Sequence, residues 1–262
     1  VNLRADQPDL PERVATCVAE GVPLVSFAGA PTKDAIGRLH DAGILVMPTV
    51  GARRHAEKML DWGVDAVIAQ GGEGGGHTGT IPTSLLLPQV VDAVGHAAPV
   101  LGAGGFHDGR GLVAALAWGA DGVAMGTRFL LTAESRVPDA VKARYLAAAV
   151  TDTVVTTALD GAPQRVIRTE TVDRLERSSV VTRLPRALRS ALAFRKLTGT
   201  TLRDLVREGL AMRRNQDLTL SQTAMAANAP MLIKAALVDG RSDVGVLPFF
   251  FNDTATTEIY TV

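Results

Sequence analysis

The chain has 262 residues, of which 47% are hydrophobic and 21% are charged, so it can bury one sizeable core or two smaller ones. Its 27 basic residues balance its 27 acidic residues, and this lack of net charge argues against nucleic acid or an anionic membrane as a partner. The single Cys17 excludes an internal disulfide framework, and no apolar run approaches the length of about 18 residues that a membrane span needs. We therefore expect a soluble, cytoplasmic, globular protein.

The first half of the chain repeats one unit, in which an amphipathic helix ends at a glycine and a short apolar strand follows. Residues 1–3 have the pattern of a strand, and further strands are expected near residues 22, 44, 66, 100 and 123. Asp9 and Pro11 are expected to open the first helix, and Thr32 to cap the second. The glycines that end the helices stand at positions 21, 43, 63, 95 and 119.

This alternation of helices with strands that are apolar on both faces predicts a parallel sheet covered by helices. Most of the helix-ending glycines are 20 to 24 residues apart, a period that suits a TIM barrel or a doubly wound sheet. Six strands are expected before residue 126, whereas a closed barrel needs eight. We therefore expect either an open sheet or an α/β TIM (β/α)8 barrel that lacks its first two βα units.

The pattern changes after about residue 130. A helix over residues 138–150 and short extended segments near residues 155 and 166 lead into a mostly helical stretch that reaches residue 238. Basic residues in this stretch have apolar partners at helical spacing, as on the solvated face of an appended helical subdomain. They are Arg183, Arg186, Arg189, Arg195, Lys196, Arg203, Arg207, Arg213 and Arg214. We expect a partial barrel over residues 1–150 and a mostly helical subdomain over residues 151–248.

Residues 249–262 differ in composition from the rest of the chain. Three consecutive phenylalanines and a threonine-rich tail follow a chain in which only 4% of residues are aromatic. This string resembles the translation of sequencing-adapter read-through. We expect it not to be native and assign it no structural or functional role.

Residues 65–79, DAVIAQGGEGGGHTG, combine a strand with a glycine loop. The apolar first part predicts a buried strand, Gln70 follows it, and five glycines surround Glu73. Because glycine loses the most freedom on folding, such a loop is costly unless backbone must approach something closely. His77 closes the loop, and histidine can transfer a proton near neutral pH, so this stretch is a candidate site for ligand and chemistry. The alternative is a surface loop with a chance histidine, and the direction of Glu73 stays open.

Two further glycine turns follow the next two strands. The first glycine turn is GAGGF at residues 102–106, and the second is MGTR at residues 125–128. Each precedes a helix, so their backbone N–H groups could together form a cup for a phosphate. If two units are missing, these turns follow strands seven and eight, where TIM barrels commonly bind phosphate. Tight turns also use glycine for their own geometry, and neither turn has the spacing of a P-loop or a dinucleotide fingerprint.

Together these segments resemble the nitronate monooxygenase (2-nitropropane dioxygenase) family of FMN-dependent TIM barrels, which includes a flavin-dependent enoyl-acyl-carrier-protein reductase. The motifs lie at residues 1–3, 70–79, 102–106 and 124–129, and the resemblance covers about residues 1–170. It implies that FMN is the cofactor and that His77 is the catalytic base or lies over the flavin. The residues that it implies as FMN contacts are Asn2, Gln70, Gly75, Gly104, Gly105, Met125, Gly126 and Thr127. The family's amino-terminal strand, with its Pro-Met and glycine contacts, is absent here.

Residues 156–169 and the helical carboxyl-terminal part resemble an actinobacterial branch of this family, which is linked to steroid-ring catabolism and acts on coenzyme A thioesters. That branch offers a role for the basic helices, because arginine and lysine could hold the phosphates of coenzyme A. The family resemblance implies oxidation of alkyl nitronates by dioxygen, and the branch implies dehydrogenation or reduction of an acyl thioester. The alternatives are an inactive fragment, a non-catalytic module that binds a phosphate ligand, and a different phosphate-binding barrel enzyme.

The remaining histidines have weaker claims to a functional role. His40 and His55 are expected on helices, and His96 at an exposed helix end. His107 follows the first glycine turn and could reach a ligand, although residues in such loops are mostly solvated. No set of His, Cys, Asp and Glu residues has the spacing of metal ligands, so we expect no metal site.

Overall fold

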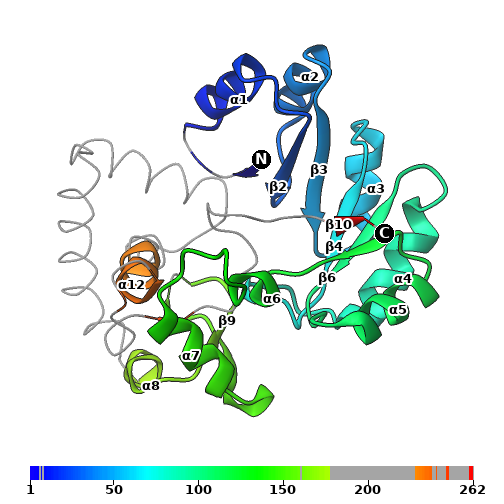
Figure 1. The fold of residues 1–262 in the computed structure, drawn as a ribbon. Coiled ribbons are helices and arrows are strands. Elements are labelled where there is room, and N and C mark those ends of the chain that lie inside the picture. Colours follow the sequence, from blue (N-terminus) through cyan, green and yellow to red (C-terminus); the bar gives the residue numbers. More distant parts are fainter. Residues whose placement is uncertain are drawn as a thin grey trace. The chain divides into compact units, whose positions relative to one another are not determined.

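The structure is a computed structural model (Figure 1). It describes residues 1–5, 7, 9–159, 161–177, 228–237, 240, 246–247 and 260–261. The basic helices expected between residues 183 and 214 lie outside these described residues. The chain divides into two compact units, one of Val1–Phe129 with Phe250–Val262 and the other of Leu130–Phe249.

The first unit is built on a parallel sheet. Its strands, in spatial order, are β1 (Asn2–Arg4), β2 (Leu24–Ala28), β3 (Leu45–Val50), β4 (Val67–Gln70), β6 (Val100–Ala103) and β7 (Gly122–Ala124). Every neighbouring pair in this order is parallel, which confirms the predicted sheet. The two-residue strand β10 (Tyr260–Thr261) pairs with β7 in the antiparallel direction. The six parallel strands described here are two fewer than a closed barrel needs.

Helices connect these strands (Figure 1): α1 (Leu10–Ala19), α2 (Lys33–Asp41), α3 (Arg53–Asp61), α4 (Thr83–Val94), α5 (Gly109–Ala117) and the short α6 (Thr127–Leu130). Thr32 caps α2 as predicted, because its hydroxyl accepts a hydrogen bond from the N–H of Ala35 at 3.2 Å. Asp9 stands at the start of α1 but makes no side-chain capping bond. Its carboxylate instead pairs with Arg13 one turn later, at 2.9 Å.

Two apolar layers pack on the two faces of the parallel sheet. Successive residues of a strand point to opposite faces, so on β3 Val46 and Val50 pack under the helices while Met47 faces the other way. Met47 belongs to an inner layer whose other buried members are Ile68, Leu101, Ala103 and Ala124. The outer layer includes Cys17, which is buried on α1, and burial raises the pKa of its thiol. Burial on both faces explains why the strands are apolar throughout.

The second unit has its own small cores. Its elements are α7 (Asp139–Ala147), the 3-10 turn η1 (Val150–Asp152), β8 (Thr153–Thr156), β9 (Gln164–Ile167), α8 (Glu170–Arg177) and α12 (Asn228–Leu237). The strands β8 and β9 pair in the antiparallel direction. Val166, Val172 and Leu175 pack together in one core. None of the helices in the described ranges has the length and apolarity to cross a membrane.

Candidate active site

Three strands end at the same level and place three loops together at the carboxyl ends of the strands. In the register of the sheet, Gln70 on β4 pairs with Ala103 on β6, and Ala103 pairs with Ala124 on β7. The glycine loop (residues 71–79) and the two glycine turns leave the sheet from these ends. Of the predicted site residues, the structure therefore brings together all but Asn2. Asn2 lies on β1, at the other edge of the parallel strands, where its amide donates to the hydroxyl of Ser26 at 2.8 Å.

The glycine loop is closely packed against its neighbours. The N–H of Gly71 donates to the carbonyl of Ala103 at 3.0 Å, so the loop starts as an extension of the sheet. A Cβ added to Gly71 would collide with both the side chain and the backbone of Thr83. Gly104 has φ +95°, and a Cβ there would stand 2.8 Å from the backbone nitrogen of Gly74. These glycines are therefore required by contact between the chain's own segments.

Glu73, whose direction the sequence left open, points back to the start of α4. Its carboxylate accepts a hydrogen bond from the N–H of Thr83 at 2.7 Å and from the hydroxyl of Thr83 at 2.6 Å. The same hydroxyl lies 3.0 Å from the carbonyl oxygen of Gly104. Glu73 thus caps α4, whose N-cap position is occupied by Pro82 without a side-chain capping bond, and it joins the loop to the first glycine turn.

His77 lies on the two-residue strand β5 (Gly76–His77), and its residue is exposed. The side-chain amide of Gln70 donates to the backbone carbonyl of His77 at 2.9 Å. The hydroxyl of Thr78 donates to the carbonyl of Gly71 at 3.2 Å. The backbone of His77 is therefore tied to the end of β4, which places this residue beside the carboxyl ends of the strands.

The two glycine turns differ from the glycine loop in their hydrogen bonding. Within the described ranges, no group accepts a hydrogen bond from the backbone N–H of Gly104, Gly105, Gly126 or Thr127. Gly104 and Gly105 both adopt positive φ, at +95° and +84°. Backbone donors without acceptors, gathered at two adjacent turns, are the donor set that a phosphate monoester requires. The residues present therefore fit the phosphate of a flavin nucleotide.

Small residues and one buried hydroxyl lie on the inner face of the sheet near these turns. Ala103 and Ala124, the last residues of β6 and β7, are small and buried on this face. Thr49 on β3 alternates with Met47 and so faces the same side. Its Oγ1 is buried and has no hydrogen-bond partner among the described residues. Sequence reasoning did not single out Thr49, and its place two residues after Met47 was the available signal.

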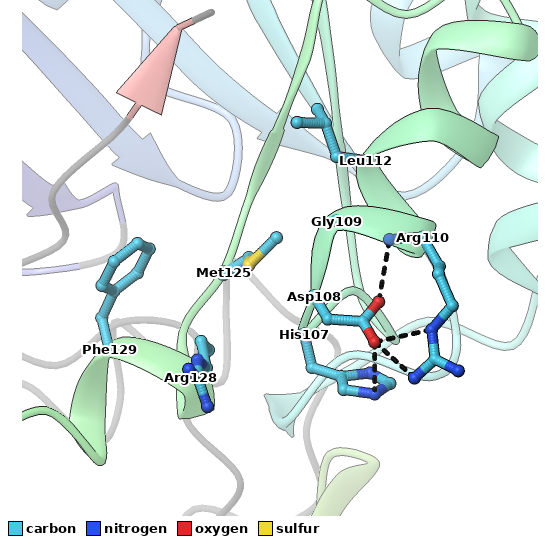
Figure 2. Close-up of a pocket in the computed structure, with 8 residues that line it drawn as sticks. All are labelled: His107, Asp108, Gly109, Arg110, Leu112, Met125, Arg128 and Phe129. Carbon is cyan, nitrogen blue, oxygen red and sulfur yellow. Dashed lines mark hydrogen bonds and ion pairs between the residues drawn. The ribbon is translucent and has the colours of Figure 1, made fainter.

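A cavity of about 570 Å³ lies between the segment that follows the first glycine turn and the second turn with α6 (Figure 2). Figure 2 shows His107, Asp108 and Arg110 on one side and Met125, Arg128 and Phe129 on the other. Gly109 and Leu112 complete the lining. Sequence reasoning gave His107 a minor claim, and the structure places it in this lining.

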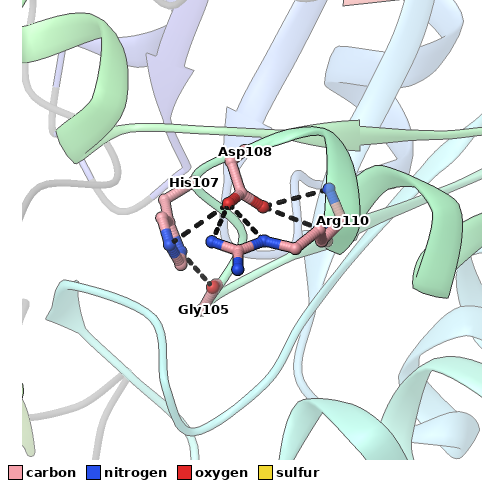
Figure 3. Close-up of polar contacts among 5 residues, drawn as sticks. Gly105, His107, Asp108 and Arg110 are labelled. Atoms are coloured by element: carbon pink, nitrogen blue, oxygen red, sulfur yellow. Dashed lines mark hydrogen bonds and ion pairs between the residues drawn. The ribbon is translucent and has the colours of Figure 1, made fainter.

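Asp108 organises one wall of this cavity (Figure 3). Its Oδ1 accepts hydrogen bonds from the N–H groups of Arg110 at 3.0 Å and Gly111 at 3.3 Å, which caps α5. Its Oδ2 accepts from the guanidinium of Arg110, with Nε at 2.8 Å. Hydrogen bonding to Arg110 lowers the pKa of the Asp108 carboxyl to about 2. The ring of His107 lies at 3.3 Å from the carbonyl of Gly105, through Nδ1.

The other histidines have structural surroundings. His40 on α2 is 2.9 Å from the carboxylate of Asp65, which also accepts from the N–H of Val46 at 2.7 Å. His55 lies on α3, where burial, Arg54 and Lys58 lower its pKa. His96 is exposed beyond the end of α4, as predicted. In the part of the chain that the structure describes, no group of His, Cys, Asp and Glu could hold a metal ion.

Comparison with known proteins identifies relatives over most of the chain. The family model described as "Nitronate monooxygenase" matches residues 2–248. A protein of Mycobacterium tuberculosis named "(3aS,4S,5R,7aS)-5-hydroxy-7a-methyl-1-oxo-octahydro-1H-indene-4-carboxyl-CoA dehydrogenase" is 57% identical over 248 residues, which cover 94% of this chain and 70% of that protein. A "Probable nitronate monooxygenase" of Staphylococcus saprophyticus is 39% identical over 170 residues, covering 60% of this chain and 47% of that protein.

Among solved structures, FabK from Thermotoga maritima has a TM-score of 0.69 and 32% sequence identity, covering 94% of this chain and 67% of that one. This likeness, together with the order and direction of the six parallel strands, confirms the predicted TIM-barrel class. The chain spans about two thirds of the FabK chain's length.

Proposed function

This chain belongs to the nitronate monooxygenase family of flavin-dependent oxidoreductases, and from that premise we propose that it forms an FMN-dependent dehydrogenase that acts on a coenzyme A thioester. One observation carries the choice of substrate. Identity to the carboxyl-CoA dehydrogenase is 57% and extends over 94% of this chain, whereas identity to the nitronate monooxygenase is 39% and extends over 60%. The match to the thioester enzyme therefore covers most of the second unit as well as the first.

The proposed cofactor site uses the edge of the sheet where the three strands end. Gly104, Gly105, Gly126 and Thr127 would hold the FMN phosphate through the backbone N–H groups that have no acceptor among the described residues. Gln70 and Gly75 would contact the flavin ring, and Met125 precedes the phosphate-binding residues of the second turn. Asn2 is bonded to Ser26 at the far end of the strand order, so only the family resemblance assigns it to this site. Thr49 adds a buried hydroxyl on the same inner face. FMN, when bound, supplies the acceptor for a hydride.

His77 would act as the acid/base group. Its backbone is held by Gln70 at the carboxyl end of β4, and its imidazole is the titratable group that the glycine loop presents there. In a dehydrogenation, His77 would take the proton from the carbon next to the thioester carbonyl, which is the most acidic carbon-bound proton of such a substrate.

Oxidation of alkyl nitronates by dioxygen is the second candidate function. The description of the family model and the identity to the Staphylococcus protein favour it. A nitronate has already lost its proton, so His77 would there orient and stabilise the anion instead of removing a proton. The two candidates therefore differ in what they demand of this one side chain.

The first step measures FMN binding by visible absorbance of the purified chain. The second step tests anaerobic reduction of the bound flavin by each substrate class. We expect bleaching of the flavin by an acyl-coenzyme A ester and none by an alkyl nitronate. His77→Ala should abolish bleaching and retain the flavin, while His96→Ala, at an exposed helix end, serves as the matched control. Bleaching by the nitronate alone would support nitronate oxidation and argue against thioester dehydrogenation. A folded chain that binds no flavin would leave a non-catalytic phosphate-binding module.

A further inference from the structure

The cavity between the segment after the first glycine turn and α6 is largely unused by the proposed chemistry. Of its lining residues, the flavin proposal involves only Met125. Its volume of about 570 Å³ lies in the range of small-molecule pockets. Leu112, Met125 and Phe129 give it an apolar surface, and all three are partly buried. A surface of this kind suits a flat ring or a short apolar group.

Two arginines border this apolar surface from different elements (Figure 2). Arg128, on α6, is exposed and has no hydrogen bond or ion pair among the described residues. Arg110, on α5, is held by Asp108, which fixes the direction of its guanidinium. Asp108 already occupies the first N–H groups of α5, so the helix terminus itself offers little to a ligand. The charge available to an anion therefore comes from the two guanidinium groups.

The charges around the cavity favour an anion. Among the described residues that line the cavity, Asp108 is the one carboxylate. It pairs with Arg110, whereas Arg128 stands on the other side of the cavity without such a partner among the described residues. A guanidinium binds phosphate oxygens through paired N–H donors, and more strongly than it binds neutral acceptors. An occupant that matches both parts of the cavity carries phosphate groups on a flat, partly apolar body. Nucleotides have this chemistry.

We propose that this cavity binds the phosphate-bearing nucleotide part of the coenzyme A thioester, with Arg110 and Arg128 on its phosphates and its ring against Leu112, Met125 and Phe129. This assignment rests on the proposed function. It places the nucleotide beside the FMN phosphate cup: the cup would use backbone N–H groups and the cavity uses side chains, and of the described residues that line the cavity, only Met125 belongs to both.

The test measures binding of adenosine 3′,5′-bisphosphate, the nucleotide head of coenzyme A, to the full chain by calorimetry in the absence of flavin. Arg110→Ala and Arg128→Ala should each weaken binding about tenfold, the usual scale for one charge-assisted hydrogen-bonding group. Arg54→Ala removes an exposed arginine on α3, outside the cavity, and should leave the affinity unchanged. Far-ultraviolet circular dichroism would establish that all variants are folded.

Three further results separate this proposal from the proposed function. Inorganic pyrophosphate should bind at least about tenfold more weakly than the nucleotide, since it cannot use the apolar surface. FMN affinity should be the same in the arginine variants and the parent chain. Nucleotide binding without flavin binding would overturn the proposed function and keep this site. Unchanged nucleotide affinity in both variants, no binding to the parent chain, equal binding of pyrophosphate, or displacement of the nucleotide by FMN would each overturn the assignment.

Discussion

The glycine loop at residues 71–79 and the glycine turn at residues 102–106 look alike in the sequence and differ in what their glycines do. In the loop, Gly71 is glycine because Thr83 leaves no space for a Cβ. At the turn, Gly104 also lacks space for a Cβ, because Gly74 lies against it, but its N–H group and that of Gly105 have in addition no acceptor among the described residues. The loop is thus a packing device that positions His77, and the turn is a set of donors held ready for a ligand. Glycine content alone does not separate these two demands.

We expect the largest effect of a single substitution at Gly71. Gly71→Ala should cost about 3 kcal/mol or more of unfolding free energy, because the added Cβ meets backbone that cannot move aside. Chemical denaturation followed by circular dichroism measures this. Gly79→Ala is the control in the same loop, since its Cβ would have only an ordinary contact at 3.9 Å with the carbonyl of Gly51. Equal losses in the two variants would contradict the packing explanation.

Glu73 tests how much the cap on α4 contributes to stability. Glu73→Ala removes the acceptor of the Thr83 N–H and should destabilise the chain by about 1–2 kcal/mol, the usual cost of a lost N-terminal cap. Glu73→Gln keeps one acceptor oxygen and should lose less than half of that. The same denaturation experiment compares them. A loss in the Gln variant as large as in the Ala variant would mean that the charge, and not the cap geometry, is what matters.

Gly105 tests whether the first glycine turn holds the FMN phosphate. Its φ of +84° makes Gly105→Ala cost about 1–2 kcal/mol in stability. The added methyl also narrows the turn whose N–H groups we assign to the FMN phosphate. We therefore expect FMN affinity to fall more than riboflavin affinity, because riboflavin lacks the phosphate. If both ligands lose affinity equally, the turn does not hold the phosphate.

The smallest effect concerns Asp108, beside the same turn. Its pKa in the folded chain is about 2, below the ordinary 3.8, because Arg110 donates to its carboxylate. Its contribution to stability is therefore present above about pH 3.8 and is lost as the pH falls through about 2. Arg110→Ala should return the pKa toward 3.8, as followed by carboxyl chemical shifts in an NMR titration. A pKa that stays near 2 in this variant would assign the shift to the helix N–H groups instead.

Local signals in the sequence predicted the framework well. Thr32 caps its helix and the glycine stops fall where expected, because both depend on residues within one turn of each other. Asp9 shows the limit of such signals: Arg13, equally close, competes for its carboxylate. Features that depend on contacts between separate segments, or on which face of the sheet a residue takes, could not be predicted from the sequence. The direction of Glu73 is set by Thr83 across the loop, and the place of Thr49 depends on the face that Met47 takes.

The cavity beside α6 was missed for a similar reason. His107, Arg110 and Arg128 are unremarkable in the sequence and become neighbours because β6 and β7 are adjacent and end at the same level. The two glycine turns, and a minor claim for His107 beside them, could be predicted there because the glycines mark the turns directly, and the phosphate cup that they would form stays a prediction.

The burial of Cys17 has a practical consequence for anyone who handles this chain. It is the chain's single thiol, it lies 5% exposed on α1, and its raised pKa keeps it protonated. A thiol reagent can then modify the chain only when α1 separates from the sheet. When the reagent reacts faster than the structure closes again, the rate of modification equals the rate of opening, measured at a natural position without an introduced label.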